Sequence, residues 1–262
     1  MSKHVIFCYS GTGNCLDIAK GIATYLGDTD IILMRSAPVI TDVRHAKKVG
    51  FVFPCYAGGL PGDMESYLPQ IQVAEDAYTF GVVSYAGYPG IGLEILDKYI
   101  HLDYWDKISH QCSCIWLLPH GMMMPPMGPK KAQARAEKLT QRVARQVFYG
   151  LPKQGKKAPP SNAFNRLEAS LWPELSAKKA KKLSASDDCI GCGQCAQLCP
   201  KGNISMVQGK PQFGSSCIGC LSCLQYCPQQ AIDMGLLTKA RGRYHNPKVS
   251  PSELCRKIIH ID

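Results

Sequence analysis

The strongest constraint on this chain is a cysteine motif that occurs twice. From residue 189 the sequence reads CIGCGQCAQLCP, and from residue 217 it reads CIGCLSCLQYCP. Both copies follow the pattern C-x2-C-x2-C-x3-C-P, and every cysteine of the first copy recurs 28 residues later. Pro200 and Ile204 recur in the same way, at Pro228 and Ile232. The repeat indicates an internal duplication, so the two copies should form one small folded unit.

This cysteine spacing suits two four-iron clusters. A cubane presents its irons at neighbouring corners, so three thiolates on one tight loop reach three irons and the fourth thiolate comes from elsewhere. In a bacterial-type ferredoxin domain, the fourth cysteine of each copy binds the other cluster. We therefore expect two 4Fe-4S clusters, one on Cys189, Cys192, Cys195 and Cys227 and the other on Cys217, Cys220, Cys223 and Cys199. Zinc, which CxxC pairs also bind, would leave the third and fourth cysteine of each copy unexplained.

The remaining cysteines are scattered along the chain. Disulfide frameworks are typical of small secreted domains, whereas this chain has 262 residues and 45% hydrophobic content. Its N-terminus lacks the pattern of a secretory signal, and no apolar stretch approaches the roughly 18 residues of a membrane span. We therefore expect a cytoplasmic protein with reduced thiols at Cys8, Cys15, Cys55, Cys112, Cys114 and Cys255.

A short polar stretch near the N-terminus has the character of a phosphate-binding turn. Residues 10–14 read SGTGN and lie between the apolar run 3–9 and a segment whose apolar residues recur at helical spacing. A strand-to-helix turn offers unpaired backbone N–H groups and the positive end of a helix dipole. The P-loop lysine is missing, and Leu16 stands where a dinucleotide fingerprint needs its third glycine. A phosphate site is favoured here, with an ordinary capped helix as the alternative.

This turn resembles the flavodoxin phosphate loop, whose pattern is Ser/Thr-x-Thr-Gly-Asn-Thr. The resemblance implies that the terminal phosphate of FMN is bound by Ser10, Gly11, Thr12, Gly13, Asn14 and Cys15. Cys15 departs from the family pattern because it replaces the last hydroxyl. The resemblance also implies an α/β fold, a doubly wound parallel sheet of order 2-1-3-4-5 with the ligand at the carboxyl ends of its strands. After the first strand, the expected strands are residues 31–34, 48–54, 78–84 and 112–118.

Two glycine-rich loops follow the third and fourth expected strands. They read PCYAGGLP from residue 54 and SYAGYPGIG from residue 84. By the same resemblance these loops flank the flavin ring, through Pro54, Cys55, Tyr56, Ala57, Gly58 and Gly59 and through Ser84, Tyr85, Ala86, Gly87 and Tyr88. Tyr56 is the first candidate to stack on the ring. A third loop holds His120 and several methionines; we expect solvent exposure for the histidine and core filling for the methionines.

The whole chain resembles the flavodoxin-ferredoxin fusion proteins of anaerobic bacteria and archaea, over residues 3–149 and 187–247. We expect a flavodoxin-like FMN-binding domain at residues 1–150, a basic linker at 151–186, and a smaller α+β ferredoxin domain with both clusters at 187–236. Residues 237–262 would form a C-terminal extension. Residues 129–182 carry 14 Lys and Arg against three acidic residues, in a chain of net charge +10.

These features favour an electron-transfer protein. A flavin exchanges two electrons and each cluster exchanges one, so the pair joins two-electron to one-electron chemistry. The alternative is a flavin-dependent reductase of a small molecule fed through its own clusters, although no acid/base pair is evident near the loops. The basic segment predicts an acidic redox partner protein, or else a solvated linker. Nucleic-acid binding is disfavoured because no binding module is present.

Overall fold

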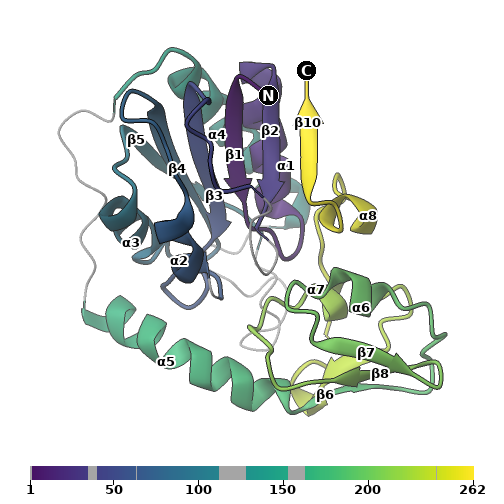
Figure 1. Ribbon diagram of the computed structural model, residues 1–262. Coiled ribbons are helices and arrows are strands. Elements are labelled where there is room, and N and C mark those ends of the chain that lie inside the picture. Colours follow the sequence, from purple (N-terminus) through teal and green to yellow (C-terminus); the bar gives the residue numbers. More distant parts are fainter. Residues whose placement is uncertain (1, 35–39, 63, 112–127, 153–162, 240) are drawn as a thin grey trace.

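The larger part of the molecule is built on one six-stranded sheet (Figure 1). The computed structural model describes residues 2–34, 40–62, 64–111, 128–152, 163–239 and 241–262. Its sheet has the order β10-β2-β1-β3-β4-β5. The strands are β1 (His4–Cys8), β2 (Thr29–Leu33), β3 (Lys48–Pro54), β4 (Tyr78–Tyr85), β5 (Tyr104–Ser109) and β10 (Ile258–Ile261).

The first five strands are parallel, which confirms the predicted order 2-1-3-4-5. The fifth place is taken by β5 at residues 104–109, and the strand expected at 112–118 lies outside the described residues. Strand β10 adds an antiparallel edge to β2, with Ile259 opposite Ile31. The end of the chain therefore belongs to the same sheet as its beginning.

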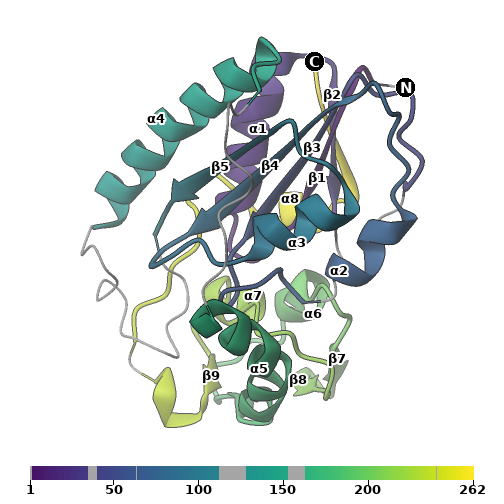
Figure 2. The same ribbon diagram turned by 90° about the vertical axis from the view of Figure 1, so that its left-hand side faces the viewer.

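Helices cover both faces of this sheet (Figures 1 and 2). One face carries α1 (Asn14–Leu26) and α4 (Pro129–Phe148), and the other carries α2 (Met64–Tyr67), the short helix η1 (Leu68–Gln70) and α3 (Gly92–Tyr99). In β1, Ile6 and Cys8 pack toward α1 and α4, while Val5 and Phe7 pack toward the opposite core. Burial on both faces explains why the strand is an uninterrupted apolar run.

The smaller domain repeats its own structure. It contains β6 (Leu183–Ala185), α6 (Gln194–Leu198), β7 (Ile204–Val207), β8 (Lys210–Phe213), α7 (Ser222–Gln225), β9 (Ile232–Met234) and η2 (Gly235–Leu237). Strands β6 and β9 are antiparallel, as are β7 and β8. The residues before α6 and α7, Gly193 and Leu221, both adopt the left-handed conformation. The duplication of the sequence is thus a duplication of backbone geometry.

Two connections join the domains. The segment expected as a linker contains α5 (Ala163–Ala180), whose Arg166 is paired with Glu94 of α3 at 2.6 Å. After η2 the chain passes back to α8 (Pro251–Leu254), which begins with a capping box between Ser250 and Glu253, and ends in β10. Among the described helices, none has the length and apolar character needed to cross a membrane.

Candidate functional site

The turn between β1 and α1 is a buried loop with free backbone donors. Gly13 begins α1 in the left-handed conformation, at φ 91°. Ser222 Oγ donates to the Gly11 carbonyl at 2.6 Å, and Asn246 N–H donates to the Thr12 carbonyl at 2.8 Å. Within the described residues, the N–H groups of Gly11, Thr12 and Gly13 make no hydrogen bond. The small domain, through Ser222, and the segment that follows it, through Asn246, therefore fix the carbonyls of the loop and leave its N–H groups for an anion.

Asn14 is tied to two distant segments. Its side-chain Nδ2 donates to the Gln111 carbonyl at 3.2 Å, and its Oδ1 accepts a hydrogen bond from the Tyr244 hydroxyl at 2.8 Å. The Oδ1 atom of Asn14 is thus already hydrogen-bonded, whereas one of the two N–H bonds on Nδ2 is available to a ligand. Tyr244 follows the small domain in the chain, so residues from both ends of the sequence set the shape of this loop.

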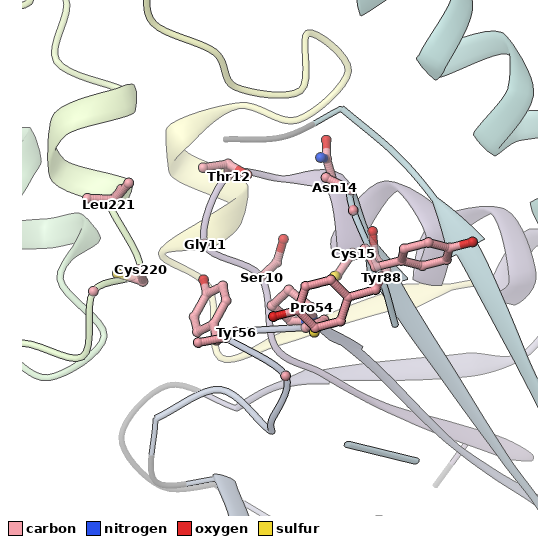
Figure 3. Close-up of a pocket in the computed structure, with 18 of the residues that line it drawn as sticks. Ser10, Gly11, Thr12, Asn14, Cys15, Pro54, Tyr56, Tyr88, Cys220 and Leu221 are labelled. Atoms are coloured by element: carbon pink, nitrogen blue, oxygen red, sulfur yellow. The ribbon is translucent and has the colours of Figure 1, made fainter. Parts of the chain in front are cut away.

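A cavity of about 310 Å³ opens beside this loop (Figure 3). It is lined by all the residues proposed from the sequence for FMN except Gly13 and Gly59. The loop after β3 makes a tight turn in which Tyr56 and Gly59 exchange backbone hydrogen bonds of 3.2 and 2.9 Å. The tyrosine rings of this loop and of the loop after β4 lie at the cavity, as the strand order requires, because parallel strands end at the same edge.

The rest of the wall comes from residues that the sequence did not suggest. They are Gln111 after β5, Glu168 and Trp172 of α5, and Gly219, Cys220 and Leu221 of the second cysteine motif. No motif marks the two α5 residues, since only the folded chain brings that helix to the cavity. Gly219 makes room for α5, because a Cβ at Gly219 would lie 3.1 Å from the Trp172 ring.

The two domains touch at Gly11. A Cβ at this position would lie 2.5 Å from the Tyr56 hydroxyl and 2.9 Å from the Cys220 carbonyl oxygen. Figure 3 shows Cys220 and Leu221 beside the loop that carries Gly11, with Tyr56 next to it. Glycine is needed here because any side chain would push the second cysteine motif away from the loop.

Burial raises the pKa of several acidic groups of the cavity. It raises the pKa of the Cys55 thiol to about 12 and raises the pKa of Cys15, although a hydrogen bond with Ser84 acts against the latter shift. Burial also raises the pKa of Glu168. None of the described lining residues is Lys or Arg. The loop donors and the aromatic rings of this cavity fit a flavin phosphate and a flavin ring.

The eight cysteines of the motif surround two further cavities. One is lined by Cys189, Cys192, Cys195 and Cys227, here called the outer set, and the other by Cys199, Cys217, Cys220 and Cys223, here called the inner set. Within the described residues, no three His, Cys, Asp or Glu side chains converge on a single-ion site. Each cavity instead brings together three cysteines of one motif and the fourth cysteine of the other. This is the grouping that two cubanes need.

Backbone donors point at several of these sulfurs. Asn203 N–H donates to Cys199 Sγ at 3.2 Å, and Ala231 N–H, which is 28 residues later, donates to Cys227 Sγ at 3.3 Å. Burial raises the pKa of Cys220 to about 11 and also raises that of Cys223. Hydrogen bonds to sulfur and limited solvent access are the means by which proteins tune bound clusters.

Cys220 connects two of the cavities. It lines the cavity of the inner set and also the large cavity beside the Gly11 loop. Among the described residues, the cavity of the outer set and the large cavity have no lining residue in common. The inner set is therefore the one next to the candidate flavin site.

Comparison with known proteins supports the assignment of the small domain. Residues 188–232 match the family described as the 4Fe-4S dicluster domain. This part of the chain is a ferredoxin-type iron-sulfur domain. No curated protein gives a significant match to the sequence.

Two solved structures align with part of the chain at low identity. Rubredoxin:oxygen oxidoreductase from the anaerobe Desulfovibrio gigas aligns over 58% of this chain and 37% of its own, with 13% identity and a TM-score of 0.37. The Trp repressor binding protein from Bacillus subtilis aligns over 53% of this chain and 97% of its own, with 12% identity and a TM-score of 0.32. The alignment thus spans well under two thirds of the Desulfovibrio gigas chain.

Proposed function

We propose that this protein carries electrons between a bound FMN, two 4Fe-4S clusters and a redox partner protein. The observation that carries the proposal is the position of Cys220, which lines both the candidate flavin cavity and the inner cluster cavity. Two redox groups held on either side of one residue can exchange electrons without a diffusional encounter. The ferredoxin-type domain at residues 188–232 supports the same role.

Each part of the cavity has a distinct task in this proposal. The N–H groups of Gly11, Thr12 and Gly13 would bind the phosphate, and Tyr56 would contact the ring. The outer and inner sets would each hold one cluster as thiolates. When bound, the flavin supplies two-electron chemistry and each cluster supplies a one-electron step. The interdomain packing at Gly11 holds the second cysteine motif against the loop.

Two exposed features of the small domain and of α5 suit the exchange with a partner. Cys192 is exposed, and Ile190 between the first two cysteines of this motif is 64% exposed. The lysines at the end of α5 and just beyond it, Lys178, Lys181 and Lys182, are also exposed. Apolar and basic groups together favour an acidic protein that docks briefly, because electrostatic steering raises association rates without tight binding.

Cofactor analysis is the first test of this function. Protein prepared without oxygen should contain about eight irons, about eight sulfides and one FMN per chain. Iron near four per chain after reconstitution would contradict the two-cluster proposal, and a flavin-free protein that does not bind added FMN would contradict the flavin site.

The second test separates an electron carrier from a reductase. The reduced protein should remain reduced when small-molecule metabolites that can accept electrons are added without a second protein. It should be reoxidised when a one-electron acceptor protein is added. Rapid reoxidation by a small molecule in the absence of any second protein would favour the reductase.

A further inference from the structure

One wall of the large cavity carries an isolated carboxyl group. Glu168 projects from α5, and its Oε2 atom is shielded from solvent and accepts no hydrogen bond from any described residue. This oxygen lies 3.5 Å from the position that a Cβ of Gly58 would occupy. The residue as a whole is half-buried, so the side chain lies between the cavity and the surface.

The surroundings of Glu168 contain no described positive charge that would hold it as an anion. Its neighbour Arg166 is paired with Glu94 at 2.6 Å. The titratable groups that line the same cavity are thiols and phenols, Cys15, Cys55, Cys220, Tyr56, Tyr85 and Tyr88. Burial is the cause of the raised pKa of Glu168. A carboxyl in such a place gains and loses a proton more readily near neutral pH than an exposed glutamate.

The proposed electron transfer creates a need for protons in this cavity. Electrons that enter from the inner cluster arrive without protons, whereas full reduction of a flavin takes up protons as well. The other titratable groups of the cavity wall are thiols and phenols, and Cys220 among them would be a cluster thiolate in the loaded protein. Among the described lining residues, Glu168 is the one carboxylic acid.

We propose that Glu168 is the residue that exchanges protons between solvent and the bound flavin. This inference rests on the proposed function. The O–H bond of the Glu168 carboxylic acid breaks and its electron pair stays on the carboxylate, while the proton forms an N–H bond on the reduced flavin. The electrons come from a one-electron donor through the clusters. The carboxylate then regains a proton from solvent, and the reverse sequence accompanies oxidation.

The experiment compares flavin reduction in the full, reconstituted protein at pH 5 to 9. Dithionite supplies the electrons, and stopped-flow absorbance follows the flavin. In the natural chain the rate should fall as pH rises through the pKa of Glu168. In Glu168→Gln this inflection should disappear, and the rate near pH 6 should drop about 100-fold, as expected when a positioned general acid is lost. Glu168→Asp should keep an inflection and move it to lower pH.

The matched control is Glu174→Gln, on the same helix. Glu174 is exposed, lies outside the cavity lining, and pairs with Lys178 at 2.6 Å. This variant removes the same charge and should leave the pH profile unchanged. An identical profile in Glu168→Gln and the natural chain would overturn the proposal. If Glu168→Gln does not bind FMN, the Glu168→Asp profile decides, and an inflection at the same pH as in the natural chain would overturn it.

These outcomes are distinct from failure of the proposed function. Absence of FMN binding by the natural chain, or clusters that dithionite reduces without any reduction of the flavin, would remove the electron-transfer proposal itself. Normal flavin reduction with no Glu168 effect removes only the proton-exchange role.

Discussion

The two copies of the cysteine motif share the same spacing of cysteines but differ in their surroundings. Ile190 of the first motif is 64% exposed, whereas its counterpart Ile218 packs against the core of the larger domain. A Cβ at Gly62 would lie 2.9 Å from the Ile218 Cδ1 atom. The outer set includes the exposed Cys192, whereas no cysteine of the inner set is exposed. One motif therefore faces solvent and the other faces the candidate flavin site.

This difference shows how a duplicated unit acquires two roles without changing its ligands. Gln194 and Ser222 occupy equivalent positions at the starts of α6 and α7. Ser222 donates to Gly11 of the larger domain, whereas Gln194 donates to the Tyr226 carbonyl within the small domain. A residue between the cysteines, Ser222, thus ties the second motif to the candidate flavin site, whereas its counterpart Gln194 makes no such contact in the described hydrogen bonds.

The largest expected effect comes from replacing the fourth cysteine of each motif. Cys199→Ser should remove or damage the inner cluster, because Cys199 lies with Cys217, Cys220 and Cys223. Cys227→Ser should damage the outer cluster instead. Cluster-resolved EPR together with iron analysis would distinguish them, with about half the iron lost in each. Damage to the outer cluster in Cys199→Ser would refute the crossed ligand assignment.

The isoleucine pair tests the contact between domains. Ile218→Ala should lower the free energy of unfolding by about 1 to 3 kcal/mol, because it removes apolar atoms packed against the larger domain. Ile190→Ala is the matched control and should change stability by less than about 0.5 kcal/mol, because its side chain is exposed. Denaturant unfolding of both variants measures the difference. Equal losses would mean that the two motifs are equally buried in solution.

Ser222→Ala should have a smaller effect that is specific to the inner site. It removes the 2.6 Å hydrogen bond to the Gly11 carbonyl and a 3.4 Å contact with Cys220 Sγ. We expect a loss of about 0.5 to 1.5 kcal/mol in stability and a lower reduction potential for the inner cluster, since hydrogen bonds to sulfur favour the reduced, more negative state. Redox titration monitored by EPR checks both clusters. Ser205→Ala on the exposed side of β7 is the control, and an equal shift in it would count against the assignment.

The smallest effect concerns the basic surface. Replacing Lys178, Lys181 and Lys182 by glutamate should slow electron exchange with an acidic partner several-fold at low ionic strength. The variant and the natural chain should converge near 1 M salt, where the screening length is about 3 Å. Stopped-flow rates across a salt series provide the measurement. Exchange rates that change neither with the substitutions nor with the salt concentration would place the docking surface elsewhere.

The order of the first four strands was predictable because each contains a local apolar run. Strand β5 at residues 104–109 was missed, because its sequence YWDKIS is not a continuous apolar run, and the fifth strand was expected at residues 112–118 instead. The ferredoxin-type domain was predictable for a similar reason, since its cysteines lie close together in sequence. Strand β10 was not predicted, because its place depends on the free edge of β2 rather than on its own residues. The α5 residues of the cavity and the Tyr244 contact with Asn14 were also missed, because they join segments that are far apart in the chain.

The return of the chain through α8 and β10 makes the small domain an insertion anchored at both ends. A separate flavodoxin and ferredoxin must find each other in solution, so their reaction slows on dilution. Here the covalent path fixes the effective concentration of one redox site around the other, whatever the amount of protein present. Under the proposed function, internal electron exchange should therefore be first-order and insensitive to dilution, which leaves the encounter with the external partner as the step that cellular abundance controls.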